Sequence, residues 1–567
     1  MRLQTPWRAT LLVAGLSLAA VGTGSAQSLI ELQKARVTQS VDLHASSEVI
    51  GSATLIDLQP AVGAWYVLTI SFAQAAPLQY HIEDSRPEGA RWSIETVETG
   101  SRLFLVSGSE HCEIWSNRAE PLQQARESGL PFVPLCNGRL YLRNNVEGTY
   151  TRIERVTQFL RDHVWGGDRI VTFVRDEAFR DAYIESGREG SAATAPRASP
   201  SAPIDAELRP EEFGRALVPE HLGIEPDAET QALSLGRWYP VRDLPGIYVG
   251  LMRGSAVPPA MLESDRSRVN ELDAVESAAL DYLVAFDLTQ FDLHFALGTD
   301  HPRLGWSERA LPEQRDARLP GPDGFDHAEP LARTGMVSPA LTAQVVATFA
   351  GGFKREHGAF HYGDLAQTHS GSHYGFMEQG VILSRLVPGL ATVYRDLDGV
   401  VDLKTWSVTD AARTERIVDA RQNGVPLIEY DPSKGRSRPG ALVNQWGAGN
   451  WSGSSEMQLR TVRAGLCLQV GPERSYLLFG YFSAATPSTM ARVFQSYGCR
   501  YAMQLDINAL EHTYLALYAH RAGRTDVEHL VDGMAEVDRK GGDQLAPRFL
   551  GFPDDRDFFY LTRKAHP

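Results

Sequence analysis

The chain has 567 residues and a formal net charge of −15. This acidity argues against nucleic acid as a partner, because binding to phosphates requires a basic surface. Hydrophobic residues make up 43% and charged residues 22%, as in globular proteins with a substantial core. A chain of this length predicts about two to four domains.

The first residues are organised like a cleavable secretory signal peptide. Arg2 and Arg8 come first, an apolar stretch follows at 9–21, and the small residues Gly24 and Ala26 precede the expected cleavage point. The apolar stretch is shorter than the roughly 20 residues that a transmembrane helix needs. We therefore expect a periplasmic or secreted protein with no transmembrane anchor after signal cleavage.

The four cysteines contain no CxxC pair, so a zinc site built on sulfur is not expected. In an exported protein an even number of cysteines indicates disulfides. Local pairing, Cys112 with Cys136 and Cys467 with Cys499, is the simplest connectivity. Free buried thiols are the alternative.

The rest of the chain is predicted to form two structured regions joined by a linker. Residues 1–26 are the signal peptide, and residues 28–187 are predicted to be a β-rich accessory domain, because apolar and β-branched runs alternate with turn residues. Residues 188–232 are predicted to be a flexible Ala/Ser/Pro-rich linker and boundary region. Residues 233–567 form the second domain.

The second domain is predicted to be α/β, or α+β, with a mixed sheet. Asp398-Gly399 and Gly471-Pro472 indicate hairpin turns. The clearest helix begins at Thr486-Pro487 and ends at Gly498. Strands are predicted at residues 284–288, 345–349, 391–395, 400–406, 466–470, 476–479 and 501–505.

Two segments at predicted strand ends could carry chemistry. Gly351 and Gly352 follow an apolar strand, so their backbone N–H groups could approach a ligand closely, and Lys354 would add a positive charge. Asp506 and Asn508 follow another strand and present a carboxylate and an amide. A tight turn and a loop-capping Asp are the structural alternatives.

Two further groups contain cationic and amide side chains. Arg463 enters a strand, where its planar fork could hold a phosphodiester, although a surface ion pair is the commoner role of an arginine. Arg421, Gln422 and Asn423 are hydrogen-bonding groups before a strand, with function and structure equally favoured.

A run of histidines, two pairs spaced by four, could hold a metal. On a helix this spacing places both rings on one face, but the surroundings are rich in Gly, Ser and Thr. No cofactor is firmly indicated; a divalent metal is the candidate, and polar loop residues are the alternative. The histidines are His357, His361, His369 and His373.

Taken in order, several of these segments resemble the phosphodiester glycosidase domain, in a bacterial exported branch with a Leu-Asp-Ile-Asn motif. The resemblance covers roughly residues 236–561. The segments that carry it are 348–354, 374–380, 388–392, 421–423, 463–465 and 502–508.

This resemblance implies an exported hydrolase acting on a glycan phosphodiester, or a related glycosidic bond, of envelope or extracellular polysaccharide. The catalytic candidates are Asp506, as acid/base or metal-holding carboxylate; His357, as proton carrier; and Lys354 and Arg463, which would hold the anionic group. The substrate-binding candidates are Gly351, Gly352, Asn508, Arg421, Gln422, Asn423 and Glu378.

A non-catalytic envelope protein that binds glycans through the same pocket is the alternative. The family usually has Asn where this chain has Ala350, and it usually has glycines and serines after the late Asp where this chain has Ile507 and Asn508. These departures remove an amide and backbone donors that could hold substrate.

Overall fold

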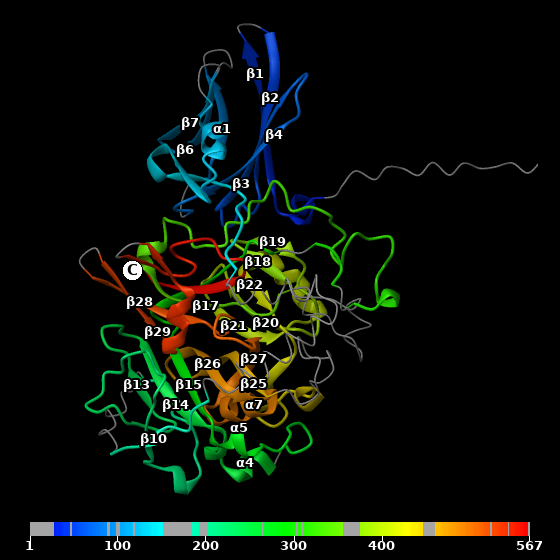
Figure 1. The fold of residues 1–567 in the computed structure, drawn as a ribbon. Helices are drawn as coiled ribbons and strands as arrows, with labels where there is room; N and C mark the ends of the chain where they lie inside the picture. Colours follow the sequence, from blue (N-terminus) through cyan, green and yellow to red (C-terminus); the bar gives the residue numbers. More distant parts are fainter. Residues whose placement is uncertain are drawn as a thin grey trace, which may run out of the picture.

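The structure is a computed structural model (Figure 1). It describes residues 28–45, 48–87, 91–97, 102–116, 120–150, 184–191, 202–263, 265–301, 304–307, 310–354, 375–445, 460–521, 524–541 and 544–564. The predicted signal peptide and the four histidines of the 357–373 run lie outside these residues. In the described ranges, no helix is long and apolar enough to cross a membrane.

The N-terminal part of the chain forms two antiparallel sheets around a core of its own (Figure 1, blue and cyan). The six-stranded sheet has the order β1 (Val37–Ala45), β2 (Glu48–Asp57), β3 (Trp65–Phe72), β4 (Leu78–Asp84), β9 (Leu140–Arg143), β8 (Phe132–Leu135). The other consists of β5 (Ser93–Val97), β6 (Arg102–Ser107) and β7 (Glu110–Ser116), with helix α1 (Pro121–Glu127) nearby.

The larger C-terminal part is built from three main sheets. The eight-stranded sheet has the order β13 (Trp238–Pro240), β14 (Ile247–Arg253), β15 (Leu280–Asp287), β26 (Ser475–Ala485), β25 (Thr461–Val470), β27 (Cys499–Ile507), β23 (Pro426–Asp431), β24 (Arg436–Pro439). One five-stranded sheet has the order β16 (Phe291–Ala296), β32 (Phe558–Arg563), β17 (Val345–Ala350), β28 (Leu515–Arg521), β29 (Arg524–His529). The other has the order β19 (Val381–Ser384), β18 (Phe376–Glu378), β22 (Ile417–Gln422), β20 (Ala391–Asp396), β21 (Val401–Thr405).

Small elements complete the described fold. The short strands are β10 (Arg188–Glu189), β11 (Ala216–Val218), β12 (Leu233–Ser234), β30 (Arg539–Gly541) and β31 (Gln544–Ala546). The α-helices are α4 (Pro259–Glu263), α5 (Ala274–Ala278) and α7 (Pro487–Ser496). The 3-10 helices are η1 (Leu29–Leu32), η2 (Cys136–Gly138), η4 (Pro210–Glu212), η5 (Gly254–Ala256), η6 (Pro312–Gln314), η7 (Thr342–Gln344), η9 (Val408–Arg416), η10 (Val443–Gln445) and η11 (Asp532–Val537).

The prediction of an α/β domain with a mixed sheet is wrong. The sheets are antiparallel, and the described helices are few and short. The connections explain this, because a parallel pair needs a crossover of about a dozen residues or more. Here β20 and β21 are joined by residues 397–400, and β25 and β26 by residues 471–474. Both predicted hairpins therefore exist, with Gly399 at a φ of 75°.

Aromatic side chains join the main sheets into one core. Phe349 on β17 lies 5.3 Å from Phe479 on β26, measured between ring centroids, so the first two sheets pack face to face. Phe295 on β16 stacks on Phe376 of β18 at 6.2 Å and adds the third sheet. Helix α7 covers the eight-stranded sheet so closely that a Cβ on Gly465 would lie 2.8 Å from Met490.

Residues 202–232, part of the predicted linker and boundary region, are packed against the larger unit. Leu208, Leu217 and Ile224 are buried there, and Ala206 N donates to Gly236 O at 2.8 Å. The Ala/Ser/Pro-rich composition of the region did not indicate that these apolar side chains would be buried.

Both predicted disulfides are present. Cys112 is bonded to Cys136 in the N-terminal unit, and Cys467 on β25 is bonded to Cys499 on β27. No described cysteine is free. Two disulfides fit an exported protein.

Candidate functional site

The ends of several strands meet around the predicted glycine pair. Register places Ala350, the last residue of β17, opposite Phe558, the first residue of β32. The chain continues from β17 into Gly351, whose N–H donates to Asp557 O at 2.9 Å. The acidic run before β32, residues 554–557, therefore lies beside the glycines.

Gly352 is packed against the side chain of Asn423. Its φ is 138°, and a Cβ there would lie 2.9 Å from Asn423 Oδ1. That oxygen accepts from Phe353 N at 3.2 Å, while Asn423 Nδ2 donates to the Gln504 and Leu505 carbonyls at 2.7 and 2.6 Å. Asn423 thus joins the end of β17 to β27, and only a glycine fits at position 352 without displacement.

The Asp557 carboxylate contacts a guanidinium group and an imidazole ring at the centre of this region. Its Oδ2 accepts from Arg421 Nε at 2.6 Å, and its Oδ1 lies 3.1 Å from His301 Nδ1. Burial acts to raise the pKa of Asp557, but Arg421 and His301 outweigh it and lower that pKa to about 2. Arg421 Nη2 also donates to Phe353 O at 2.6 Å, so this carboxylate fixes the loop after the glycines.

Lys354 is bonded to two carboxylates. Its Nζ donates to Asp300 Oδ2 at 3.1 Å and to Asp555 Oδ2, and it lies 5.1 Å from the centroid of the Tyr150 ring. Tyr150 Oη donates to Asp300 Oδ1 at 2.6 Å. Burial opposes ionisation of Asp300, but Lys354 and Tyr150 prevail and lower its pKa below the usual value.

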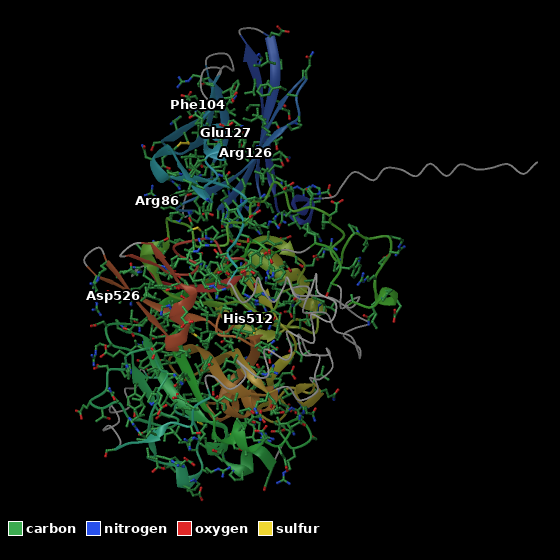
Figure 2. All side chains as sticks on the ribbon, in the orientation of Figure 1. Arg86, Phe104, Arg126, Glu127, His512 and Asp526 are labelled. Atoms are coloured by element: carbon green, nitrogen blue, oxygen red, sulfur yellow. A yellow bond between two sulfur atoms is a disulfide. The ribbon has the colours of Figure 1, made fainter. Side chains whose placement is uncertain are left out.

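Asp506, Arg556 and His512 form a bonded chain at the end of β27. Asp506 Oδ2 accepts from Arg556 Nη1 at 2.6 Å, and its Oδ1 accepts from Ile507 N at 2.8 Å. His512 Nδ1 lies 2.7 Å from the Ile507 carbonyl, which can only accept, so Nδ1 carries the proton. His512 Nε2 then accepts from Arg556 Nη2 at 2.6 Å. Figure 2 labels His512, whose side chain is 18% exposed.

These groups form three neighbouring sets of bonded side chains, which the consecutive residues Asp555, Arg556 and Asp557 bring together. We call them the strand-end cluster. A concentration of ionisable groups like this one marks either a functional site or a structural ion-pair network. In the part of the chain that the structure describes, no group of three or more His, Cys, Asp or Glu side chains is arranged to hold a metal ion. The cluster consists of Asp300, His301, Lys354, Arg421, Asn423, Asp506, His512, Asp555, Arg556 and Asp557.

Six of the predicted site residues lie in or against this cluster: Gly351, Gly352, Lys354, Arg421, Asn423 and Asp506. The others have different surroundings. His357 lies outside the described residues.

Arg463 lies on β25 opposite Ile507, next to Asp506 in the paired strand. Its side chain, however, donates to Ala485 O at 2.7 Å and to Gln504 Oε1 at 2.9 Å. Burial lowers the pKa of Arg463 to about 9. The contacts of Arg463 are therefore those of a residue that ties β25, β26 and β27 together.

Gln422 and Asn508 differ in how their polar atoms are used. Gln422 is fully buried and exchanges hydrogen bonds with Val387 N and O at 2.7 and 2.9 Å, so it braces a loop. Asn508 has a φ of 82°, and its buried Oδ1 has no hydrogen-bond partner among the described residues. That oxygen is an available acceptor two residues from Asp506.

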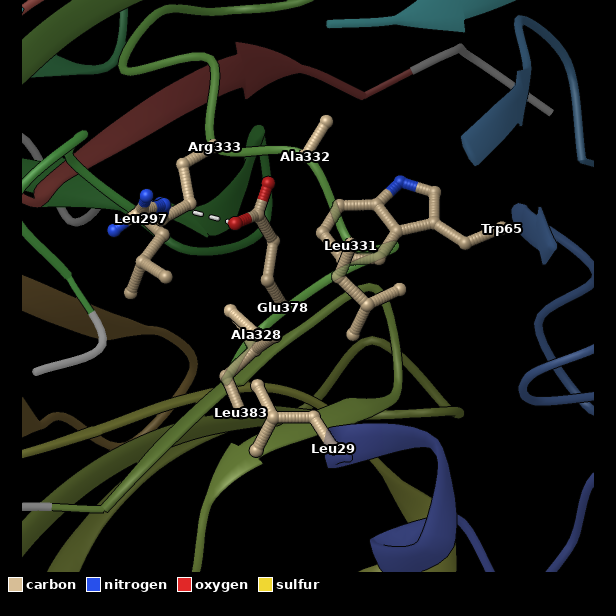
Figure 3. Close-up of a pocket in the computed structure, with 9 residues that line it drawn as sticks. All are labelled: Leu29, Trp65, Leu297, Ala328, Leu331, Ala332, Arg333, Glu378 and Leu383. Carbon is tan, nitrogen blue, oxygen red and sulfur yellow. Dashed lines mark hydrogen bonds between the residues drawn. The ribbon is translucent and has the colours of Figure 1, made fainter. Parts of the chain in front are cut away.

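Glu378 faces the N-terminal unit, where it lines a small cavity shown in Figure 3. Its Oε2 accepts from Leu297 N at 2.9 Å, and its Oε1 lies 3.5 Å from Arg143 Nη2. Burial raises the pKa of Glu378 to about 7, against the lowering effect of Arg143. Its contacts are those of an interface residue.

The sequence interpretation assigned no role to six members of the cluster: Asp300, His301, His512, Asp555, Arg556 and Asp557. A signal for three of them exists, since residues 554–557 are a charged run directly before the apolar strand 558–561. Asp300 and His301 follow β16 with no comparable pattern.

Comparisons with known proteins do not establish a family. No family model matches the chain, and no curated protein is similar to it in sequence. The similar solved structures include the zebrafish N-acetylglucosamine-1-phosphodiester alpha-N-acetylglucosaminidase catalytic domain, auto-inhibited by its pro-peptide, at 9% identity and a TM-score of 0.30 over 57% of this chain and 85% of that one. A Synechocystis protein has 10% identity and a TM-score of 0.29, with 88% of this chain and 97% of that one covered. A Burkholderia pseudomallei protein described as exported has 9% identity and a TM-score of 0.23, with 50% of this chain and 74% of that one covered. TM-scores this low carry no argument about function.

Proposed function

We propose that this chain is an exported hydrolase, periplasmic or secreted, that cleaves a sugar-1-phosphodiester or a related glycosidic bond of envelope or extracellular polysaccharide. The strand-end cluster is the proposed site of cleavage. The ordered motifs of the sequence support the substrate class, and the two disulfides fit the compartment.

The observation that carries the proposal is the bonded set of Asp506, Arg556 and His512. Asp506 accepts from two donors, at 2.6 and 2.8 Å, which fix its orientation, and a carboxylate suits a group facing positive charge on a sugar carbon. His512 is a neutral imidazole with an exposed fraction of 18%, and imidazole is the side chain best suited to carry protons near neutral pH. Arg556 holds both groups, and in this proposal its guanidinium would balance the charge that a phosphate oxygen gains.

The proposed reaction is attack of water on the anomeric carbon. The bond from that carbon to the phosphate oxygen breaks and the water oxygen stays on the sugar. The proton that water loses passes to His512 Nε2, whose bond from Arg556 Nη2 must break first, and from there to the departing phosphate monoester. The products are a free sugar and a phosphate monoester. Asn508 Oδ1 would accept from a sugar hydroxyl, because it has no partner among the described residues.

The test is an assay of the purified chain with an alkyl sugar-1-phosphodiester in water enriched in oxygen-18. We expect equimolar free sugar and alkyl phosphate, with the label in the sugar. Label in the phosphate would contradict attack at carbon, and no product from any such diester would contradict the proposal.

Non-catalytic glycan binding at the same place is the alternative, and one observation favours it. Lys354, Arg421 and Arg556 are each already bonded to a carboxylate, so their charges are largely balanced before a phosphate arrives. This alternative predicts that calorimetry detects binding of the diester while the labelled assay detects no product.

A further inference from the structure

A groove at the opposite end of β27 from Asp506 has the composition of a ligand site. Arg500, the second residue of β27, lines it, and Asp506 stands six residues further on, about 20 Å along an extended strand. The groove has a volume of about 720 Å³, inside the range of about 300–1,000 Å³ that ligand sites occupy. It is therefore separate from the strand-end cluster.

An aromatic ring and a guanidinium lie together in this groove. Tyr430, at the end of β23, is 46% exposed, and the Arg500 guanidinium lies 5.7 Å from its ring centroid. Ser437, opposite Tyr430 on the edge strand β24, donates to Arg500 O at 3.1 Å and fixes the backbone beneath. An exposed tyrosine offers a flat apolar face, which suits the C–H face of a sugar ring.

The charges of the groove favour an anion. Arg500 has no carboxylate within ion-pair distance in the described part of the chain, and Arg436, 41% exposed, lies 3.8 Å from Asp265. Glu207 is the opposing carboxylate among the lining residues. The residues that line the groove include two arginines and one carboxylate, a net positive lining on a protein whose net charge is −15.

We propose that this groove is a second carbohydrate-binding site, which takes an acidic oligosaccharide. A sugar ring packs on Tyr430, and sugar carboxylates meet Arg436 and Arg500, whose forks match two oxygens. Gln495 and Glu207 also line the groove, and in this proposal they bond to sugar hydroxyls. The inference does not depend on which bond the strand-end cluster acts on.

The test is calorimetric titration of the full chain with trigalacturonate and, as the neutral counterpart, maltotriose. We expect binding of trigalacturonate, at least about tenfold tighter than that of maltotriose and weaker in 0.5 M salt than in 0.05 M salt. Tyr430→Ala and Arg500→Ala should each weaken it about tenfold. Both side chains are exposed, so both variants should unfold at the temperature of the unmodified chain.

Matched controls separate this site from the rest of the molecule. Phe213→Ala and Arg318→Ala remove an exposed aromatic and an exposed arginine elsewhere, with exposed fractions of 58% and 88%, and should leave affinity unchanged. Asp506→Asn should also bind trigalacturonate normally, even where it abolishes hydrolysis. Absence of binding, equal affinity for maltotriose, or unchanged affinity in Tyr430→Ala and Arg500→Ala would overturn the proposal.

Discussion

Gly352 shows how a single residue constrains the strand-end cluster. We expect Gly352→Ala to lower the free energy of unfolding by about 1–3 kcal/mol, because the new Cβ would lie 2.9 Å from Asn423 Oδ1 at a φ of 138°. Urea denaturation measures the loss. Gly435→Ala is the control, since Gly435 has a φ of 61° but nothing within 4 Å of its Cβ position. Equal losses would show that the Asn423 contact is unimportant.

The Asp557 carboxylate gives a prediction about acid stability. Its pKa is about 2 in the folded protein, below its ordinary value of 3.8. Its contribution to the free energy of unfolding is therefore full above pH 4 and is lost as the pH falls through 2. Asp557→Asn leaves Arg421 buried without this partner, and we expect a loss of about 3–5 kcal/mol at pH 7.

Urea denaturation of both proteins between pH 7 and pH 2 provides the measurement for Asp557. The gap between wild type and Asp557→Asn should narrow towards pH 2. A gap that stays constant with pH would contradict the ionised role of this carboxylate.

At the scale of elements, β18 connects the larger unit to β4 and β9 of the N-terminal unit. Arg143 on β9 contacts Glu83 on β4 as well as Glu378 on β18, and its guanidinium lies 4.2 Å from the Trp65 ring centroid. His81, also on β4, accepts from Ala332 N at 3.0 Å. The two units therefore meet through a buried polar contact.

This contact should depend on pH through Glu378. Its pKa is raised to about 7, so its contribution to stability is full below pH 4.5 and is lost as the pH rises through 7. The glutamine of the Glu378→Gln variant cannot titrate. Between pH 5 and 8 the free energy of unfolding of this variant should therefore fall less than that of wild type, by on the order of 3 kcal/mol. Parallel urea-denaturation curves across this interval would refute the raised pKa.

At the scale of the whole molecule, the two disulfides act on different units. The Cys467–Cys499 bridge links β25 and β27 across a separation of 32 residues, and replacing both cysteines by serine should cost about 3–4 kcal/mol. The Cys112–Cys136 bridge belongs to the N-terminal unit. Its removal should leave hydrolysis unchanged, as measured by the diester assay; a loss would place the N-terminal unit in the reaction.

Local signals predicted individual hairpins and one helix, but the predicted fold class was wrong because it depends on long-range strand pairing. The hairpins at Gly399 and Gly471 and helix α7 follow from turn and capping residues. The antiparallel order of the sheets depends on which distant strands pair, such as β32 with β16 and β17, and no local pattern encodes that.

The candidate site divides in the same way. Glycines and polar residues at strand ends were visible in the sequence, and Gly352, Asn423 and Asp506 are brought together. Their partners Asp300 and Arg556 could not be identified from the sequence, because both lie far along the chain from Gly352, Asn423 and Asp506. Arg463 and Glu378 carry functional groups that could serve in an active site. In the structure, however, Arg463 donates to a buried backbone carbonyl and Glu378 lies against Arg143.

The central claim is that hydrolysis occurs at Asp506, Arg556 and His512, and one comparison tests it most directly. The rate of sugar release from an alkyl sugar-1-phosphodiester should fall at least about a hundredfold in Asp506→Asn. It should persist in Asp287→Asn, which disrupts another buried carboxylate–arginine pair, that with Arg474. Equal rates in wild type and Asp506→Asn, or equal losses in the two variants, would contradict the claim.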